Sequence, residues 1–326
     1  MGSEQQYIEL YEQCRQMIFD HSPAWMNAVR DEAFEHFKSA GFPSRKVERY
    51  KYTDMQALFA PDYGLNLKRL EIPVDPYNAF RCDVPNLSTS LYFVVNDAFY
   101  TKVHPKGHLP EGVIVGSIKE YADKAADYYS KLAKTNEDAV TALNTMLAQD
   151  GLYVYVPKNV KVDRAVQVIN ILKAPTAWGR TGEEALMVNR RVLIVLEEGA
   201  ELKMLFCDHA ADDCRFLATQ VIEAYVGDNA SLDLYCLEET HAKNVRVSNV
   251  YIDQQRDSRV NHNVITLHNG ITRNKLDLTF SGEGAECTCY GCVIADKQQH
   301  VDKNTLITHK VPHCTSNELY KYVLRS

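Results

Sequence analysis

The second half of the chain constrains its fold more than any other part of the sequence. From Leu152 onward helical periodicity nearly disappears, and short apolar runs follow one another between turn-forming residues. Such runs indicate β-strands, and about a dozen of them in roughly 170 residues are typical of a sandwich, a barrel or a β-solenoid. The runs cover residues 152–156, 166–172, 192–196, 202–206, 221–226, 232–237, 245–252, 260–267, 271–280, 287–294 and 306–311.

A turn repeats within this half of the chain. Three times a glycine-containing turn is followed by an alanine and then by alternating apolar residues, at Ala200, Ala230 and Ala285, which lie 30 and 55 residues apart. These intervals are close to one and two units of about 28 residues, and a corner that recurs at a fixed interval suits stacked coils. The alternative is a sandwich whose glycine turns match by chance, and the pattern alone leaves both open.

The first half of the chain mixes helices with short strands. Helix signals include Pro23 directly after Ser22, a C-terminal stop at Gly41, and Asp138 as the start of a helix that ends before Gly151. We expect helices over residues 23–41, 44–59, 117–132 and 138–148, and short strands over 91–95 and 113–115. The chain then divides into a helical N-terminal region (1–90), a mixed α/β connecting segment (91–150) and a β core (151–326).

Composition excludes several classes of protein. Hydrophobic residues make up 45 % of the 326 residues, so wholesale disorder is excluded. A formal net charge of -7 argues against a nucleic-acid binder. The N-terminus lacks the pattern of a secretory signal, and the longest apolar run is too short to span a bilayer. Nine cysteines without the dense spacing of a disulfide scaffold favour a reducing compartment. We expect a cytoplasmic protein that binds neither nucleic acid nor membranes.

Two groups of residues are candidate metal ligands. Three thiols, Cys287, Cys289 and Cys292, lie within six residues, and thiolates hold zinc or iron–sulfur clusters. Because Cys287 and Cys289 alternate along a strand, they share one face, and packing in the core is the favoured interpretation. The second group is His309, His313 and Cys314, for which roles in the sheet and its turns are the favoured interpretation.

The sequence contains no recognisable catalytic motif. The phosphate-binding loop of ATPases, the Gly-x-Ser-x-Gly elbow and the His-Glu-x-x-His zinc motif are all missing from the sequence. We therefore name no catalytic residue and expect a protein that is not an enzyme. One alternative is a cytosolic β-solenoid enzyme that acts on a carbohydrate or a similar polymer, which requires clustered carboxylates. Asp208, Asp212 and Asp213 are its candidates, although they lie in a loop-like stretch and a solvated turn is the favoured interpretation.

Two stretches together resemble one protein family. Residues 45–53, Arg-Lys-Val-Glu-Arg-Tyr-Lys-Tyr-Thr, resemble the N-terminal motif of the SufB/SufD family of iron–sulfur cluster assembly proteins, and residues 298–321 resemble a later stretch of it. The length of the N-terminal part and the lack of a SufB-like insertion make the chain most similar to SufD. The matched positions are Glu48, Lys51, Tyr52, Thr53, Gln298, Asp302, Thr305, His309, Ser316 and Lys321.

The resemblance implies both a fold and a role. The fold is a right-handed parallel β-helix, a β-solenoid, behind an α-helical N-terminal region. The role is that of a non-catalytic scaffold subunit in a SufBCD-type complex, with SufB-like and SufC-like (ATPase) proteins as partners. No cofactor is bound tightly by this chain, whereas the full complex carries a transient iron–sulfur cluster. By analogy with the pairing of SufB and SufD, a homodimer through the sheet edges is also implied.

The resemblance also sets an expectation about length. Family members continue well beyond the position of Lys321, through a Cys-Ser-His-Gly-Ala-Thr motif and C-terminal helices that contact SufC. We therefore expect this chain to lack the C-terminal part of a SufD-like protein, with its β-helix lacking a cap at that end. No catalytic residue is transferred from the family, and His309, Cys314 and Lys321 are the matched positions to test first.

Overall fold

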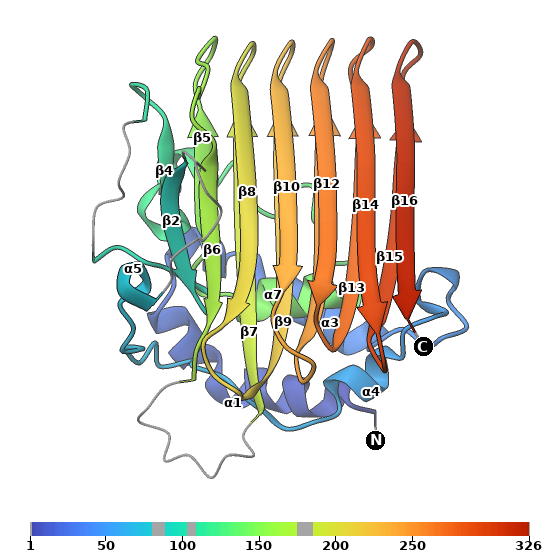
Figure 1. The fold of residues 1–326 in the computed structure, drawn as a ribbon. Coiled ribbons are helices and arrows are strands. Elements are labelled where there is room, and N and C mark those ends of the chain that lie inside the picture. The colour runs from blue at the N-terminus through green and yellow to red at the C-terminus, as the bar shows by residue number, and fades with distance from the viewer. Residues whose placement is uncertain (1, 80–88, 103–108, 175–184, 326) are drawn as a thin grey trace.

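In a computed structural model, the chain builds two layers of parallel strands with helices beside them (Figure 1). The structure describes residues 2–79, 89–102, 109–174 and 185–325. From β7 onward, successive strands alternate between two sheets, and each pairs in parallel with the strand two places ahead. Residues 185–325 therefore form a β-solenoid of about five turns, preceded by a mixed region with several helices.

Each sheet has eight strands. We call the first the covered sheet, because helices pack on its outer face; its strands, in chain order, are β1 Tyr63–Gly64, β4 Ile114–Ser117, β5 Leu152–Val156, β7 Ala185–Leu196, β9 Arg215–Val226, β11 Val245–Gln254, β13 Ile271–Phe280 and β15 His300–His309. The second is the open sheet, made of β2 Ser90–Val95, β3 Ala98–Phe99, β6 Val166–Leu172, β8 Glu201–Ala210, β10 Ser231–Glu239, β12 Arg259–His268, β14 Glu286–Asp296 and β16 Thr315–Arg325. Only β2 with β3 and β4 with β5 pair antiparallel among the described strands.

One corner recurs in every coil of the solenoid. The corner consists of two residues, and the first of them has a positive φ each time: 67° at Gly199, 56° at Asn229, 52° at Asp257, 74° at Gly284 and 61° at His313. A small residue follows each of them: Ala200, Ala230, Ser258, Ala285 and Cys314. Consecutive corners are joined by backbone hydrogen bonds, such as Arg259 N to Ala230 O (2.9 Å) and Glu286 N to Ser258 O (2.9 Å). The Gly–Ala repeat is thus the corner of a solenoid, and Ser258 fills the coil between Ala230 and Ala285.

The corner makes a prediction about glycine. Gly284→Ala should lower the free energy of unfolding by about 1–2 kcal/mol, because an L side chain is strained at this φ and the new Cβ would meet Asp257 Oδ1. His313→Gly at the equivalent position of the last coil is the control, and it should leave stability within about 1 kcal/mol of the original chain. Urea unfolding followed by circular dichroism measures both. Equal stability of Gly284→Ala and the original chain would contradict this account of the corner.

Apolar side chains fill the space between the two sheets. Ile194, Leu234, Leu278 and Phe280 are among those with 0 % exposure. A second core lies on the other side of the covered sheet, where α7 packs on β7 and β9, and α1 and α3 pack on α7. The helices are α1 Glu4–Asp20, α2 Ala24–Asn27, α3 Arg30–Ala40, η1 Glu48–Tyr50, α4 Met55–Phe59, α5 Pro76–Ala79, η2 Ile118–Glu120, α6 Ala122–Ala125 and α7 Ala139–Leu147.

Two of the expected helices are much shorter than the sequence pattern indicated. The stretch 117–132 holds only η2 and α6, because Ser117 donates to Asp150 Oδ1 (2.6 Å) instead of capping a helix. The stretch 44–59 holds only η1 and α4. The helix after Asp138 is confirmed, with its side chain accepting from Thr141 N (3.0 Å), and so is the stop at Gly41. The division at residues 90 and 150 stays a prediction.

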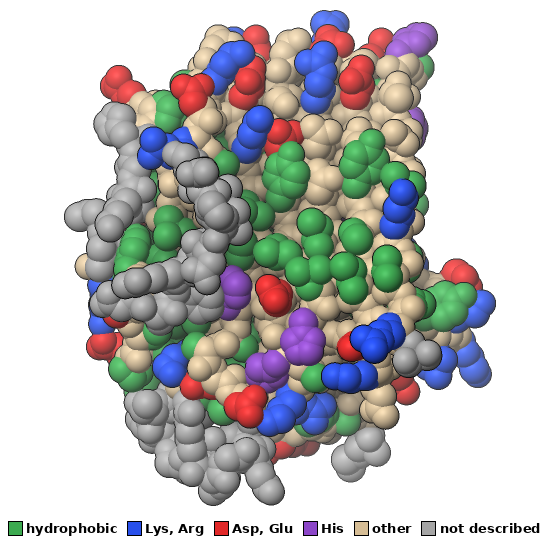
Figure 2. All heavy atoms as spheres, in the orientation of Figure 1, with side chains coloured by type: hydrophobic (Ala, Val, Ile, Leu, Met, Phe, Trp, Pro, Cys, Tyr) green, Lys and Arg blue, Asp and Glu red, His purple; other side chains and the backbone are tan. Residues whose placement is uncertain are grey.

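The outer face of the open sheet carries a group of hydrophobic side chains. Figure 2 shows them gathered over the middle of this face. Tyr235, Ile265, Tyr290 and Leu319, which come from four neighbouring strands, are between 40 % and 50 % exposed. Among the described residues, no helix is long and apolar enough to cross a membrane.

Candidate functional site

The fold brings together the two stretches that carry the family resemblance. Thr53, at the end of the first stretch, donates from Oγ1 to Asp302 Oδ2 (2.6 Å) and lies 3.2 Å from His300 Nε2. Thr53 and Asp302 are 249 residues apart in sequence and both are buried. The hydrogen bond between Thr53 and Asp302 therefore joins the N-terminal region to the end of the solenoid, and both residues are matched positions of the two motifs.

Charged and aromatic side chains extend this contact. The guanidinium of Arg273 lies 4.0 Å from the ring centroid of Tyr50 and donates to Arg49 O (2.7 Å). Arg49 in turn pairs with Asp277 at 2.7 Å. Arg273 has no exposed surface, so water does not stabilise its positive charge and groups inside the contact must do so. One of these groups is Asp302, whose carboxylate lies 3.7 Å from Arg273 Nε.

Asp138 lies at the centre of the same contact. Its carboxylate caps α7, accepts from Asn249 Nδ2 (2.9 Å) and from the hydroxyl of Tyr50, and lies 3.3 Å from Lys275 Nζ. Burial works to raise the pKa of Asp138, but the charge of Lys275 and the hydrogen bond from Tyr50 hold it below its usual range. We call Tyr50, Thr53, Asp138, Arg273, Lys275 and Asp302 the junction cluster.

The remaining matched positions lie outside the junction cluster. Glu48, Lys51 and Tyr52 are exposed on the turn that carries Tyr50. Thr305 hydrogen-bonds to Tyr320 through the two hydroxyls (2.8 Å), and Ser316 Oγ lies 3.3 Å from His309 Nε2. Gln298 is exposed in the turn before β15, and Lys321 is exposed on β16.

The candidate metal ligands occupy separate environments. Cys287 and Cys289 face the core between the sheets and are 3 % and 0 % exposed, whereas Cys292 of the same strand lies on the outer face. His309 packs edge-on against Phe280, with ring centroids 4.7 Å apart. His313 and Cys314 are the two corner residues of the last coil, where Cys314 Sγ contacts Gly282 O at 3.4 Å. Within the described ranges, no three His, Cys, Asp or Glu side chains group in a way that could hold a metal ion.

The two inward thiols influence each other. The hydrogen bond between them lowers the pKa of Cys287 and raises that of Cys289, and burial adds to the rise. A buried thiol with a raised pKa is a poor nucleophile and a poor ligand, because both roles need the thiolate. Core packing therefore explains Cys289 without any further role.

Sequence reasoning missed a group of charges between the two sheets. Asp208 accepts from Arg190 (2.8 Å) and from Arg246 (2.7 Å), and Arg246 also pairs with Glu238 (2.8 Å). Glu238 accepts further hydrogen bonds from Thr266 (2.6 Å) and Asn274 (2.9 Å). We call Arg190, Asp208, Glu238, Arg246 and Asn274 the interior polar cluster. Their spacing was available as a signal, because Asp208, Glu238 and Thr266 lie one coil apart, in register.

The interior polar cluster has a defined charge state. Burial works to raise the pKa of Asp208, but Arg246 and Arg190 hold it below its usual range. Nearby, burial lowers the pKa of Lys303, and burial together with the charges of Lys303 and Arg246 lowers the pKa of His262 to about 4. His262 is therefore neutral at pH 7, and its Nε2 has no hydrogen-bond partner in the part of the chain that the structure describes.

His262 predicts a loss of stability in mild acid. The unfolded chain takes up a proton near pH 6.5, whereas the folded chain does so only near pH 4, so stability falls as the pH falls through this window. The expected contribution is about 3 kcal/mol between pH 7 and pH 4. Urea unfolding at several pH values measures this. Between pH 7 and pH 4, the free energy of unfolding of His262→Gln should fall by about 3 kcal/mol less than that of the original chain. His21→Gln, at an exposed position, is the matched control. If the free energy of unfolding of His262→Gln varies with pH as it does in the original chain, the prediction is wrong.

The carboxylates proposed for a carbohydrate enzyme do not gather at one site. Asp208 belongs to the interior polar cluster. Asp212 pairs with Lys173 at 3.1 Å, and Asp213 is 91 % exposed beside Lys243. A glycosidase needs two carboxyl groups that face the same bond. The geometry of these three residues does not offer such a pair.

Two family profiles match the chain in succession. The SufBD protein N-terminal region matches residues 1–168, and the SufBD core domain of SUF-system FeS cluster assembly matches residues 179–326. The first match ends within β6, and the second begins before β7 and so covers residues 185–325 of the solenoid.

Curated relatives carry the same family names. A SufBD family protein of Synechocystis sp. is 21 % identical over 308 residues, covering 90 % of this chain and 65 % of the relative. The chloroplastic protein ABCI8 of Arabidopsis thaliana is 23 % identical over 324 residues, covering 92 % of this chain and 56 % of the relative. SufD of Bacillus subtilis is 24 % identical over 320 residues, covering 95 % of this chain and 69 % of the relative. The chain thus spans between about half and two thirds of these relatives. Because the two profiles together cover nearly the whole sequence, this chain belongs to the SufBD family of iron–sulfur cluster assembly proteins.

Proposed function

We propose that the chain is a SufD-like scaffold subunit that works with SufB-like and SufC-like (ATPase) partners and is not itself catalytic. The observation that carries the proposal is the similarity to Bacillus subtilis SufD, which spans 95 % of this chain. The N-terminal motif and the stretch 298–321 support it, because their residues meet in the junction cluster. The iron–sulfur cluster is cargo in this proposal, assembled by the complex and passed on.

The surface of the solenoid supports a role in protein assembly. The hydrophobic side chains on the open sheet form the type of exposed apolar surface that marks contact sites between proteins. The described cysteines are free thiols, in keeping with a reducing compartment, and we place the protein in the cytoplasm.

Co-purification tests the proposal. The protein should be expressed under reducing conditions together with the SufB-like and SufC-like proteins of the same organism. We expect a stable complex on size-exclusion chromatography, in which ATP hydrolysis depends on the SufC-like subunit alone. A complex that never forms would overturn the proposal, and so would ATP hydrolysis by this chain without SufC.

A further inference from the structure

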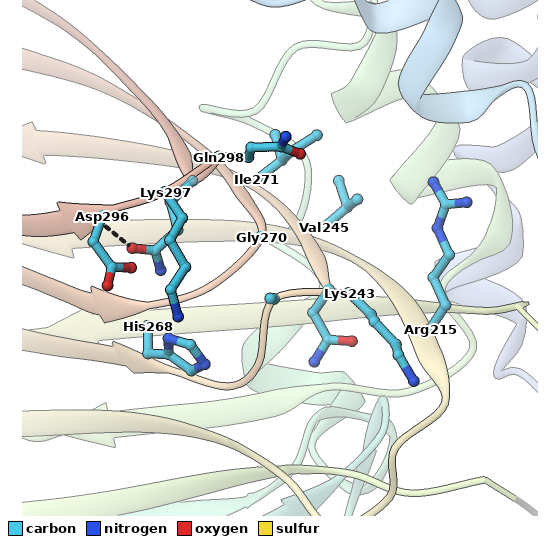
Figure 3. Close-up of a pocket in the computed structure, with 12 residues that line it drawn as sticks. Arg215, Lys243, Val245, His268, Gly270, Ile271, Asp296, Lys297 and Gln298 are labelled. Atoms are coloured by element: carbon cyan, nitrogen blue, oxygen red, sulfur yellow. Dashed lines mark hydrogen bonds between the residues drawn. The ribbon is translucent and has the colours of Figure 1, made fainter. Parts of the chain in front are cut away.

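A groove follows the turns that lead from the open sheet to the covered sheet. Here a cavity of about 740 Å³ opens across neighbouring coils (Figure 3). We call it the turn groove; its principal side chains are Arg215, Lys243, His268 and Lys297, which are basic, and Val245 and Ile271, which are apolar. Figure 3 shows Lys297 and His268 on one side of the groove, Arg215 on the other, and Lys243 between them.

The cations of the turn groove are poorly matched by carboxylates. Within the described part of the chain, Arg215 and Lys297 have no carboxylate within ion-pair distance, and Arg215 instead lies 5.8 Å from the ring centroid of Tyr63. Among the described residues, Lys243 contacts Asp213, through its backbone oxygen (3.3 Å) and through its side chain (3.4 Å), which is 91 % exposed. Asp296 is the acidic residue of the lining. In a chain of net charge -7, this local excess of positive charge attracts anionic groups.

The groove is also held in shape before any ligand enters. Gln299 donates to Asn269 O (2.8 Å) and accepts from Asp296 N (2.8 Å), which fixes the turn that carries Lys297. Asn244, another lining residue, is 3 % exposed, and its amide nitrogen has no hydrogen-bond partner among the residues described. A buried donor without a partner is costly, so an incoming carbonyl or carboxylate oxygen is the kind of group this wall lacks.

The spacing of the cations suggests an extended ligand. Arg215 is the first residue of β9, Lys297 lies in the turn before β15, and β11 and β13 lie between these strands. Three steps of about 4.8 Å separate the starts of β9 and β15 by about 14 Å. Residues i and i+4 of an extended peptide are also about 14 Å apart and point to the same side. Residue i+2 then falls midway, over the starts of β11 and β13, where Ile271 is half-buried and Val245 is 3 % exposed.

We propose that the turn groove binds an extended peptide segment of a protein partner, with carboxylates at positions i and i+4 and an apolar side chain at i+2. One carboxylate faces Arg215 and Lys243 at one end of the groove, and the other carboxylate faces Lys297 at the opposite end. The apolar side chain packs on the floor of the groove. This goes beyond the scaffold role, since it assigns a partner chemistry to a surface distinct from the junction cluster and the apolar face of the open sheet.

Fluorescence anisotropy with two short peptides tests the proposal. Fluorescein-labelled Glu-Ser-Leu-Ser-Glu has the required spacing, and Glu-Glu-Leu-Ser-Ser has the same composition and charge without it. We expect the first to bind about fivefold more tightly or better, with an affinity that falls as salt is raised. The double variant Lys243→Gln/Lys297→Gln should weaken its binding about tenfold.

The control is a variant that also loses two lysines, but at the end of the open sheet far from the turn groove. The double variant Lys161→Gln/Lys203→Gln removes the same charge from exposed positions and should change the affinity less than about twofold. Equal binding of the two peptides would overturn the proposal, as would equal losses in the two double variants. Displacement of the peptide by inorganic phosphate at similar concentration would also overturn it, because it would show a site for small anions. Thermal melts of both variants confirm that they remain folded.

Discussion

Asp208→Ala should lower the free energy of unfolding by about 3–5 kcal/mol. The side chain is 4 % exposed and accepts from both Arg190 and Arg246, so its removal leaves buried positive charge without its partner. Arg246 retains Glu238, but Arg190 keeps only the backbone oxygen of Asn96 (2.9 Å) among the described residues. The loss therefore comes mainly from Arg190, whose guanidinium lies between the sheets with 3 % exposure.

Two further variants separate charge from packing. Asp208→Asn keeps the shape and the hydrogen bond from Asn170, so it should cost less than Asp208→Ala, about 2–3 kcal/mol. Glu201→Ala on the same strand is the control, because its partner Lys161 is 2.5 Å away but both side chains are about half exposed; it should cost less than about 1 kcal/mol. Urea unfolding at pH 7 measures all three. If Asp208→Ala and Glu201→Ala cost the same, the interior polar cluster does not stabilise the fold as described.

The solenoid could be predicted from the sequence because its corners repeat. Ala200, Ala230 and Ala285 carry the signal, since each is a small, buried residue at the same point of its coil. Ser258 and Cys314 fill the same position with other small side chains, and Asp257 and His313 take the positive φ that glycine takes elsewhere. A search for one residue type therefore finds some coils and misses others.

The buried charges were harder to predict, although they follow the same period. Glu238 lies opposite Asp208 in the next coil, but a charged residue in a strand normally predicts a solvated face. The junction cluster was out of reach for a different reason. The contact between Thr53 and Asp302 spans 249 residues, and no local pattern encodes a pairing over that distance. Only the resemblance linked the two stretches, and it did not indicate that they touch.

Asp138→Ala should lower the free energy of unfolding by about 4–5 kcal/mol, because it removes two functions at once. The carboxylate is the N-cap of α7, and it is also the buried partner of Lys275, whose side chain is 2 % exposed. Asn is as good an N-cap as Asp, so Asp138→Asn keeps the cap and loses only the charge. Asp138→Ala should therefore be less stable than Asp138→Asn by about 1 kcal/mol.

The same variants should loosen the N-terminal region before the solenoid unfolds. Tyr50 donates to Asp138, and its turn is held to the covered sheet by Arg273. Hydrogen exchange should therefore become faster at the amides of residues 48–53 in both Asp138 variants, while β9 and β11 keep their protection. Glu137→Ala is the matched control, because Glu137 is next in sequence and pairs with Lys134 at 3.6 Å on the surface; it should change neither quantity. Uniform acceleration across the solenoid would mean that Asp138 supports the whole fold instead of joining the N-terminal motif to it.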